Sequence, residues 1–352
     1  RSNAAKAFAA ALQCVDHGCG QCNACRTTLS GAHPDVTLVR TEALSIGVDE
    51  VRELVRRAAM NPVHGCHQVV VVEDADRITE RGADALLKAI EEPAPKTVWL
   101  LCAPTPEDVI VTIRSRCRRL HLATPRDEAV ADLLTRRDGI APEVAAEAAR
   151  AGQGHIGRAR RLAWDEEARA RRNAIGELPT RLRSLGDCLQ AAEDLVNQAS
   201  EEAAAATAEV NAAERAELKK ALGFGSSGAR PRNAQAALRD LEKQQSARLK
   251  RLQRDALDRV LTELTAYHRD VLAIQTGAVR PEEENALRGA RLVNAGWSAS
   301  LHRIADSQSP EHTVATIDAI LAARKSLEHG VTPLLVMETL LIAMTGVDRA
   351  RW

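Results

Sequence analysis

The chain has 352 residues, which is enough for two or three domains that each have a core of their own. Lysine plus arginine and aspartate plus glutamate both total 48, so the net charge is zero and no overall positive field attracts nucleic acid. Aromatic residues make up only 2% of the chain, which favours helices packed through small and aliphatic side chains. No apolar run reaches the roughly 18 residues of a membrane span, and we find no secretory leader. We therefore expect a cytoplasmic protein with reduced thiols and no membrane partner.

The first residues, RSNAAKAFAAALQC, have the pattern of a helix that is already under way, with no strand before it. We expect a first strand and a phosphate-binding loop to precede Arg1. The pair Arg1 and Ser2 would then occupy the position of the Lys-Ser/Thr that ends such a loop, with arginine in place of lysine. This pair is a candidate for a degenerate nucleotide site.

Four of the eight cysteines lie within twelve residues and follow the spacing C-x4-C-x2-C-x2-C. They are Cys14, Cys19, Cys22 and Cys25. A loop with two-residue spacings can supply four thiolates to one tetrahedral zinc ion, and such a filled site leaves no position open for substrate. Two disulfides, an iron–sulfur cluster, or a site that uses His17 are the alternatives. The other cysteines (Cys66, Cys102, Cys117 and Cys188) are scattered and read as small buried residues.

Strands and helices alternate from Val36 to about Leu122. We expect strands over 35–40, 67–76 and 97–103, helices over 48–60 and 81–92, and a helix end at 113 that leads into a last strand up to 122. Four consecutive valines in 69–72 are typical of a strand covered on both faces of a parallel sheet. The alternation predicts a parallel α/β sheet.

Acidic residues follow the valine strand, and arginines follow the last predicted helix of this region. Glu73, Asp74 and Asp76 stand where a magnesium-binding strand end would carry its acids, although a group of solvated acids fits equally well. Arg114, Arg116, Arg118 and Arg119 are concentrated at a helix end. One of them can reach a phosphate bound on a neighbouring subunit, or all of them can cap the helix and form surface ion pairs.

Every segment after Pro125 is predicted to be helical. Residues 125–165 form three short helices, and a helix from about Ser200 to Leu222 and another from Ala234 to about Ile274 predict a projecting hairpin at about 200–275. Basic residues on the second arm alternate with acids, so an ion-paired, solvated face competes with a contact to DNA phosphates. These basic residues are Arg248, Lys250, Arg251, Arg254 and Arg259.

A cysteine cluster after the first helix, then ALLKAIEEP (85–93), then IRSRCR (113–118), resembles the delta-prime subunits of the bacterial DNA polymerase III clamp loader. The stretch GVTPLLVMETLLIAM (330–344) is similar to the last helix of their collar. The resemblance implies an AAA+ α/β module over 1–123, a small helical lid over 124–166, and an all-α collar over 167–352.

The family also implies roles for individual residues. The four clustered cysteines bind structural zinc, and Ser115, Arg116 and Cys117 form the SRC motif. Arg116 of that motif points towards ATP on an adjacent motor subunit. Three departures indicate a subunit that does not hydrolyse ATP. They are Arg1 in place of the loop lysine, the acid order at Glu73 and Asp74, and Gly157 where active motors carry the sensor-2 arginine, with Arg158 displaced by one position.

The resemblance leads to one principal function and two alternatives. The chain is expected to be a stator that assembles with gamma/tau motor subunits and a delta subunit, and that acts on the sliding beta clamp and primer-template DNA through the complex. The first alternative is an ATP-hydrolysing gamma/tau-type motor. The second is a separate zinc-dependent DNA-binding protein, which the neutral net charge disfavours.

Overall fold

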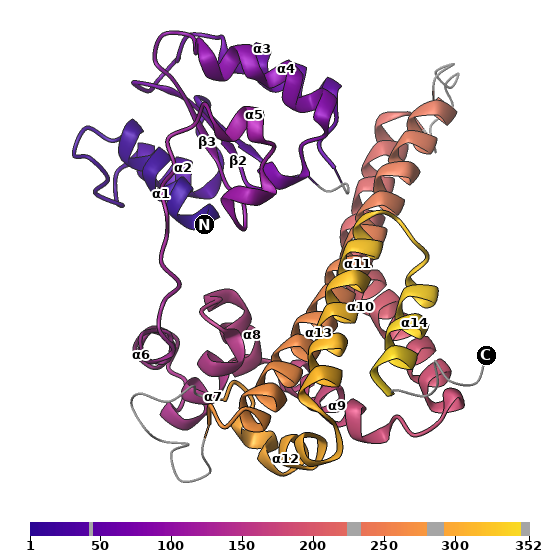
Figure 1. Cartoon of the computed structure of the whole chain (residues 1–352). Coiled ribbons are helices and arrows are strands. Elements are labelled where there is room, and N and C mark those ends of the chain that lie inside the picture. The colour runs from indigo at the N-terminus through magenta and orange to yellow at the C-terminus, as the bar shows by residue number, and fades with distance from the viewer. Residues whose placement is uncertain (42–44, 224–233, 280–291, 346–352) are drawn as a thin grey trace. The chain divides into compact units, whose positions relative to one another are not determined.

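The computed structural model describes residues 1–41, 45–223, 234–279 and 292–345 (Figure 1). The chain forms two compact units, Arg1–Leu122 and Ala123–Trp352. The first combines a sheet with helices, and the described part of the second is helical. The predicted fold class, a parallel α/β module followed by helical domains, is confirmed, whereas the predicted division of the helical part at residues 166 and 167 stays a prediction.

The first unit is built on a three-stranded parallel sheet. Its strands are β1 (Val36–Val39), β2 (Gln68–Val72) and β3 (Thr97–Leu101), in the order β1-β2-β3. Helix α3 (Val48–Ala58) connects β1 to β2, and α4 (Glu80–Glu91) connects β2 to β3. Proline and glycine are absent from all three strands, and β-branched residues dominate them, as expected for a buried sheet.

The central strand β2 is buried along its whole length. Successive side chains of a strand point to opposite faces, so both faces of the sheet must be covered at β2. Val70 and Val72 join the core beneath α3 and α4. Val69 and Val71 join a second core together with Ala9 of α1 (Ser2–Gln13). Helices therefore cover both faces of the sheet in Figure 1, which explains the run of four valines.

The expected last strand up to residue 122 is wrong. Helix α5 (Val111–Arg114) is followed by a turn, and no strand forms between 115 and 122. Leu120 is 85% exposed and Leu122 is 46% exposed, so these residues do not pack as a buried strand would. A strand needs a neighbour for its backbone hydrogen bonds, and residues 115–122 pair with neither edge of the described sheet.

The described part of the second unit is built from helices and one 3₁₀ turn. Its elements are α6 (Asp127–Asp138), α7 (Pro142–Gly152), α8 (Ile156–Trp164), α9 (Glu166–Arg181), α10 (Leu185–Ala221), α11 (Ala234–Gln275), η4 (Ala295–Trp297), α12 (Ser298–Ser307), α13 (Pro310–Glu328) and α14 (Pro333–Thr345). Leu134 and Ala149 belong to a core of α6 to α8, and Leu261 and Met337 to a larger core of the long helices. None of the helices described is long and apolar enough to cross a membrane.

Helices α10 and α11 lie side by side as the predicted hairpin (Figure 1). The first arm begins at Leu185 rather than near Ser200, because Ser184 and Asp187 form a capping box that starts the helix there. Residues 224–233, between the two predicted arms, lie outside the described residues. Arg248 pairs with Glu214 across the hairpin, and further ion pairs of this surface join Arg259 to Glu202 and Arg251 to Asp255.

Candidate functional site

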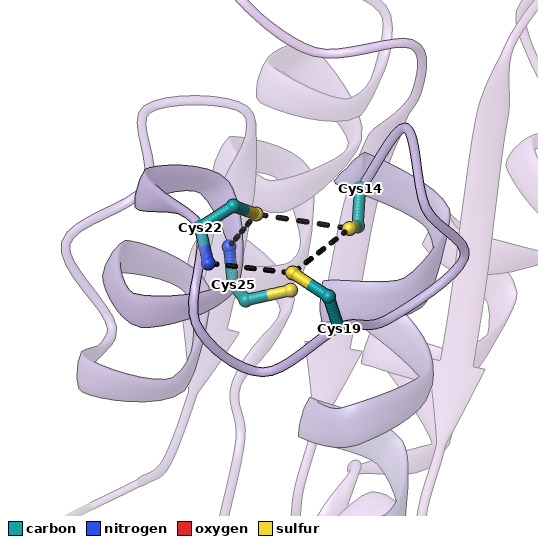
Figure 2. Close-up of side chains that lie close together, drawn as sticks. All are labelled: Cys14, Cys19, Cys22 and Cys25. Atoms are coloured by element: carbon teal, nitrogen blue, oxygen red, sulfur yellow. Dashed lines mark hydrogen bonds between the residues drawn. The ribbon is translucent and has the colours of Figure 1, made fainter.

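The four clustered cysteines converge on one point between two helices of the first unit. Cys14 follows the end of α1, Cys22 caps the start of α2 (Asn23–Ser30), Cys25 lies in the first turn of α2, and Cys19 lies in the connecting loop. Their Sγ atoms are all within 4.8 Å of one another (Figure 2). The Sγ of Cys14 is 3.7 Å from that of Cys19 and 3.7 Å from that of Cys22. The four thiols can hold one metal ion.

These distances distinguish between the alternatives raised by the sequence. All four cysteines are free thiols, with sulfur separations far beyond the roughly 2.05 Å of a disulfide. Four thiolates at about 2.3 Å from one tetrahedral ion lie about 3.8 Å apart, close to the two measured separations. An iron–sulfur cluster instead spreads its thiolates over several irons. His17 is not part of this group in the portion of the chain described.

The backbone of the loop turns sharply where the sulfurs converge. Gly18 has φ of 106° and Gly20 has φ of 76°, values in the left-handed region that glycine adopts without strain. The backbone N–H of Cys22 donates to the Sγ of Cys19 at 3.3 Å, and that of Cys25 donates to the Sγ of Cys22 at 3.4 Å. Such N–H groups stabilise negative charge on sulfur, so the loop suits thiolate ligands.

The thiols differ in their acidity. A hydrogen bond from the Cys19 backbone is the main cause that lowers the pKa of Cys14 to about 6. Burial is the main cause that raises the pKa of Cys25 to about 12, and its side chain is fully buried. A metal ion must therefore displace a proton from Cys25, and the buried thiolate then needs the ion as its counter-charge.

The cysteine loop is tied to the segment before β2 through Gln13. The Gln13 side chain donates to the carbonyl of His67 at 2.6 Å and accepts from the N–H of Cys66 at 3.1 Å. Asp35, 1% exposed, accepts three backbone N–H groups of residues 63–65 at 2.6–2.7 Å. These bonds fix the position of α1 relative to the sheet.

The candidate nucleotide residues gather around the end of β2. Glu73, the first residue after the strand, accepts a 2.7 Å ion pair from Lys6 of α1, and its side chain is 11% exposed. Burial raises the pKa of the nearby Cys102 thiol, the charges of Glu73 and Asp74 raise it further, and the charge of Arg1 opposes them. Arg1, Glu73 and Asp74 thus all lie near enough to Cys102 for their charges to act on its thiol, and Ser2 begins α1. Their role in nucleotide binding stays a prediction.

Arg116 lies in the turn directly after α5, and its side chain is 37% exposed. Its Nε donates to the carboxylate of Glu91, the last residue of α4, and its Nη1 donates to the carbonyl of Thr112 at 2.9 Å. Arg114 donates to the carbonyl of Pro106 at 3.2 Å. Both arginines thus form surface contacts with their own chain, and Arg116 retains exposed area from which to reach outwards.

Arg158, which the sequence places one residue after the expected sensor-2 position, has a structural partner. Its Nη2 donates to Glu263 of α11 at 2.5 Å, and its side chain is 18% exposed. The second oxygen of Glu263 accepts from Arg172 at 3.2 Å. Arg158 is therefore held inside the second unit in this conformation.

Comparison with known proteins finds similarity in the first unit of the chain. Residues 1–126 match the family model described as DNA polymerase III, delta subunit. The matched range contains the cysteine loop, the sheet and the turn that carries Arg116, so the predicted resemblance is confirmed for the first unit.

Individual relatives point the same way. The delta-prime subunit of DNA polymerase III from Haemophilus influenzae is 36% identical over 138 residues, which cover 38% of this chain and 42% of the relative. The delta-prime subunit from Escherichia coli K12 is 34% identical over 155 residues, 44% of this chain and 46% of the relative. The gamma/tau subunit from Mycobacterium tuberculosis H37Rv is 34% identical over 133 residues, 36% of this chain and 23% of the relative. The matches span less than half the length of these relatives.

Sequence reasoning missed the partners of the candidate residues. Lys6 is 67 positions from Glu73 by their numbers, and Glu91 is 25 positions from Arg116, so no local pattern links them. Glu91 lies within the family stretch 85–93, but its contact with Arg116 depends on how α4 packs beside α5. Gln13 lies directly before Cys14, but no pattern in the sequence predicted its hydrogen bonds to Cys66 and His67.

Proposed function

We propose that the chain is a delta-prime-type subunit of the DNA polymerase III clamp loader, and that it does not hydrolyse ATP itself. It supplies Arg116 in trans to ATP on a neighbouring motor subunit. The observation that carries the proposal is Arg116 in the SRC motif, on an exposed turn after α5, within the segment that matches the delta-subunit family model. Ser115 and Cys117 flank it and complete the motif.

The chemistry expected of Arg116 is electrostatic. A guanidinium that reaches a γ-phosphate stabilises the charge that develops as the phosphoryl group transfers, and such fingers are worth about 10³–10⁵ in rate in GTPase systems. Arginine suits this role because it stays charged and donates from a planar fork that matches phosphate oxygens. The exposed position of the turn supports a contact between the Arg116 guanidinium and ATP on another subunit.

Two contacts support the absence of hydrolysis by the chain itself. Glu73 is neutralised by Lys6 at 2.7 Å, so the acid that would polarise water already has a counter-ion. Arg158 is paired with Glu263, so the arginine nearest the sensor-2 position is engaged within the helical unit. The arginine at Arg1, where such a loop carries lysine, and the order of the acids Glu73 and Asp74 also fit a compromised nucleotide site.

We further propose that Cys14, Cys19, Cys22 and Cys25 bind one structural zinc ion. Two sulfur separations of 3.7 Å and backbone N–H groups directed at sulfur support a single tetrahedral ion. When bound, zinc would neutralise the buried thiolate of Cys25 and hold the loop between α1 and α2. Metal analysis should give one zinc per chain, and visible absorption from an iron–sulfur centre would contradict the assignment.

The partners follow from the family. The proposal includes gamma/tau motor subunits, a delta subunit, the beta clamp, and primer-template DNA reached through the assembled complex in the cytoplasm. The basic residues of α11 do not support a separate DNA surface, because Arg248, Arg251 and Arg259 have acidic partners within the hairpin.

The decisive experiment measures the DNA-stimulated ATPase of the assembled complex with Arg116→Ala, and with Arg119→Ala as a matched control in the same segment. We expect Arg116→Ala to assemble normally on size-exclusion chromatography and to lower turnover by at least about a hundredfold. Arg119→Ala should retain turnover. Normal ATPase turnover with Arg116→Ala would refute the proposed role of Arg116 in trans.

A gamma/tau-type motor is the second candidate, favoured by the 34% identity to the Mycobacterium tuberculosis gamma/tau subunit over 133 residues. It predicts that the purified chain, without partners, converts ATP to ADP. Our proposal predicts no turnover above that of a buffer control.

A further inference from the structure

The guanidinium of Arg116 is already engaged within its own chain. Nε donates to the Glu91 carboxylate, while Nη1 donates to the Thr112 carbonyl at 2.9 Å and to the Ser115 hydroxyl at 3.4 Å. Glu91 ends α4 and Thr112 lies in α5, two helices that pack against each other. The side chain is therefore held back along α5.

We infer that Glu91 is a positioning residue that holds Arg116 in this retracted state until a phosphate group on a neighbouring subunit takes its place. This inference rests on the proposed role of Arg116 in trans. Arginine binds a phosphate through two parallel N–H groups, and the Nε group that Glu91 occupies belongs to one such pair. Carboxylate and phosphate thus compete for the same donor.

The exposure of the pair suits a reversible hold. The side chain of Arg116 is 37% exposed and that of Glu91 is 45% exposed, so water screens their attraction. Exposed ion pairs contribute little to stability, and a phosphate with more negative charge, in a drier interface, outcompetes the carboxylate. The pair of Glu263 and Arg172 is buried, by contrast, so water does not screen it in the same way.

The inference predicts that weakening the hold raises the activity of the neighbouring subunit before DNA is added. Glu91→Gln keeps the size of the side chain and removes its charge. In the assembled complex we expect kcat for ATP without DNA to rise about two- to fivefold, with KM unchanged, since exposed pairs shift equilibria by no more than this. Glu92→Gln removes the same charge one position further along and should have no effect.

A double variant tests whether the effect passes through Arg116. If it does, Glu91→Gln adds nothing in an Arg116→Ala background. A rise of similar size in that background would overturn the inference, as would an unchanged or lowered kcat for Glu91→Gln alone. Glu91→Asp, which restores the charge, should return kcat towards the original value.

The two proposals fail in different ways. If Arg116→Ala lowers the stimulated ATPase but Glu91→Gln changes nothing, the trans role stands and the hold by Glu91 is refuted. If Arg116→Ala leaves the ATPase intact, the trans role falls, and the inference about Glu91 falls with it.

Discussion

Glu263 joins three helices of the second unit through one buried carboxylate. It lies in α11 and is 5% exposed, and its two oxygens accept from Arg158 of α8 at 2.5 Å and from Arg172 of α9 at 3.2 Å. The Arg172 guanidinium also lies 4.3 Å from the ring centroid of Trp297. Burial lowers the pKa of Arg172, and the charge of Glu263 opposes this effect. Replacing Glu263 by glutamine leaves two guanidinium groups without their shared counter-charge.

The cost follows from the burial. Removing one partner of a buried ion pair costs ~3–5 kcal/mol, because the remaining charge keeps its desolvation penalty. Glutamine still accepts one hydrogen bond, so we expect the lower end, about 3 kcal/mol. For a unit of this size each kcal/mol lowers Tm by ~2–4 °C, which predicts a fall of roughly 6–12 °C for the second unit.

Glu202 provides a matched control. It also accepts from two arginines, Arg161 at 2.6 Å and Arg259 at 2.8 Å, but its side chain is 27% exposed. Pairs with this access to water contribute at most about 1 kcal/mol, so Glu202→Gln should have a small effect. The free energy of unfolding of both variants is measured by urea denaturation of the full chain, followed by circular dichroism. Equal losses for the two variants would refute the argument from burial.

Other substitutions test the first unit and the packing of α9. Cys22→Ser should release metal and lower the melting temperature of the first unit, whereas Cys66→Ser, an exposed thiol outside the cluster, should do neither in metal analysis and calorimetry. Burial raises the pKa of the Asp35 carboxyl, but hydrogen bonds from the backbone N–H groups of residues 63–65 outweigh burial and hold this pKa below its ordinary value. The ionised Asp35 therefore contributes stability that is present above the unfolded pKa near 4 and is lost as pH falls through the lower folded value. Asp35→Asn should weaken this fall of the unfolding free energy at acid pH, as measured by urea titrations. Gly176→Ala should destabilise by ~1–3 kcal/mol on denaturation, although alanine favours helices, because its Cβ would lie 2.6 Å from Trp297. An increase in stability would show that the ring moves freely.

The features that were predictable from the sequence are those encoded by short-range patterns. Four consecutive valines predicted a strand buried on both faces, and β2 packs Val69 and Val70 into separate cores. The spacing of Cys14 to Cys25 predicted convergent sulfurs, which two glycines in the left-handed region bring together. The local sequence pattern sufficed because each feature involves residues that lie close together in the sequence.

The features that were not predictable depend on tertiary packing. Arg116 was identified by its motif, but its partner Glu91 could be found only once α4 and α5 were placed together. The same holds for Arg158 and Glu263, which are 105 positions apart. The last strand was mispredicted because Leu120 and Leu122 have the apolar character of a strand, while the structure leaves both side chains exposed and pairs their segment with neither edge of the described sheet.

The ion pair between Lys6 and Glu73 has a practical consequence for work with chelating agents. Since the carboxylate after β2 draws its counter-charge from an amine of the same polypeptide, its folded position does not depend on dissolved magnesium. If the four cysteines hold zinc as proposed, loss of structure on treatment with EDTA traces to them rather than to this acid. A titration with a zinc-selective chelator in excess magnesium separates the two contributions directly.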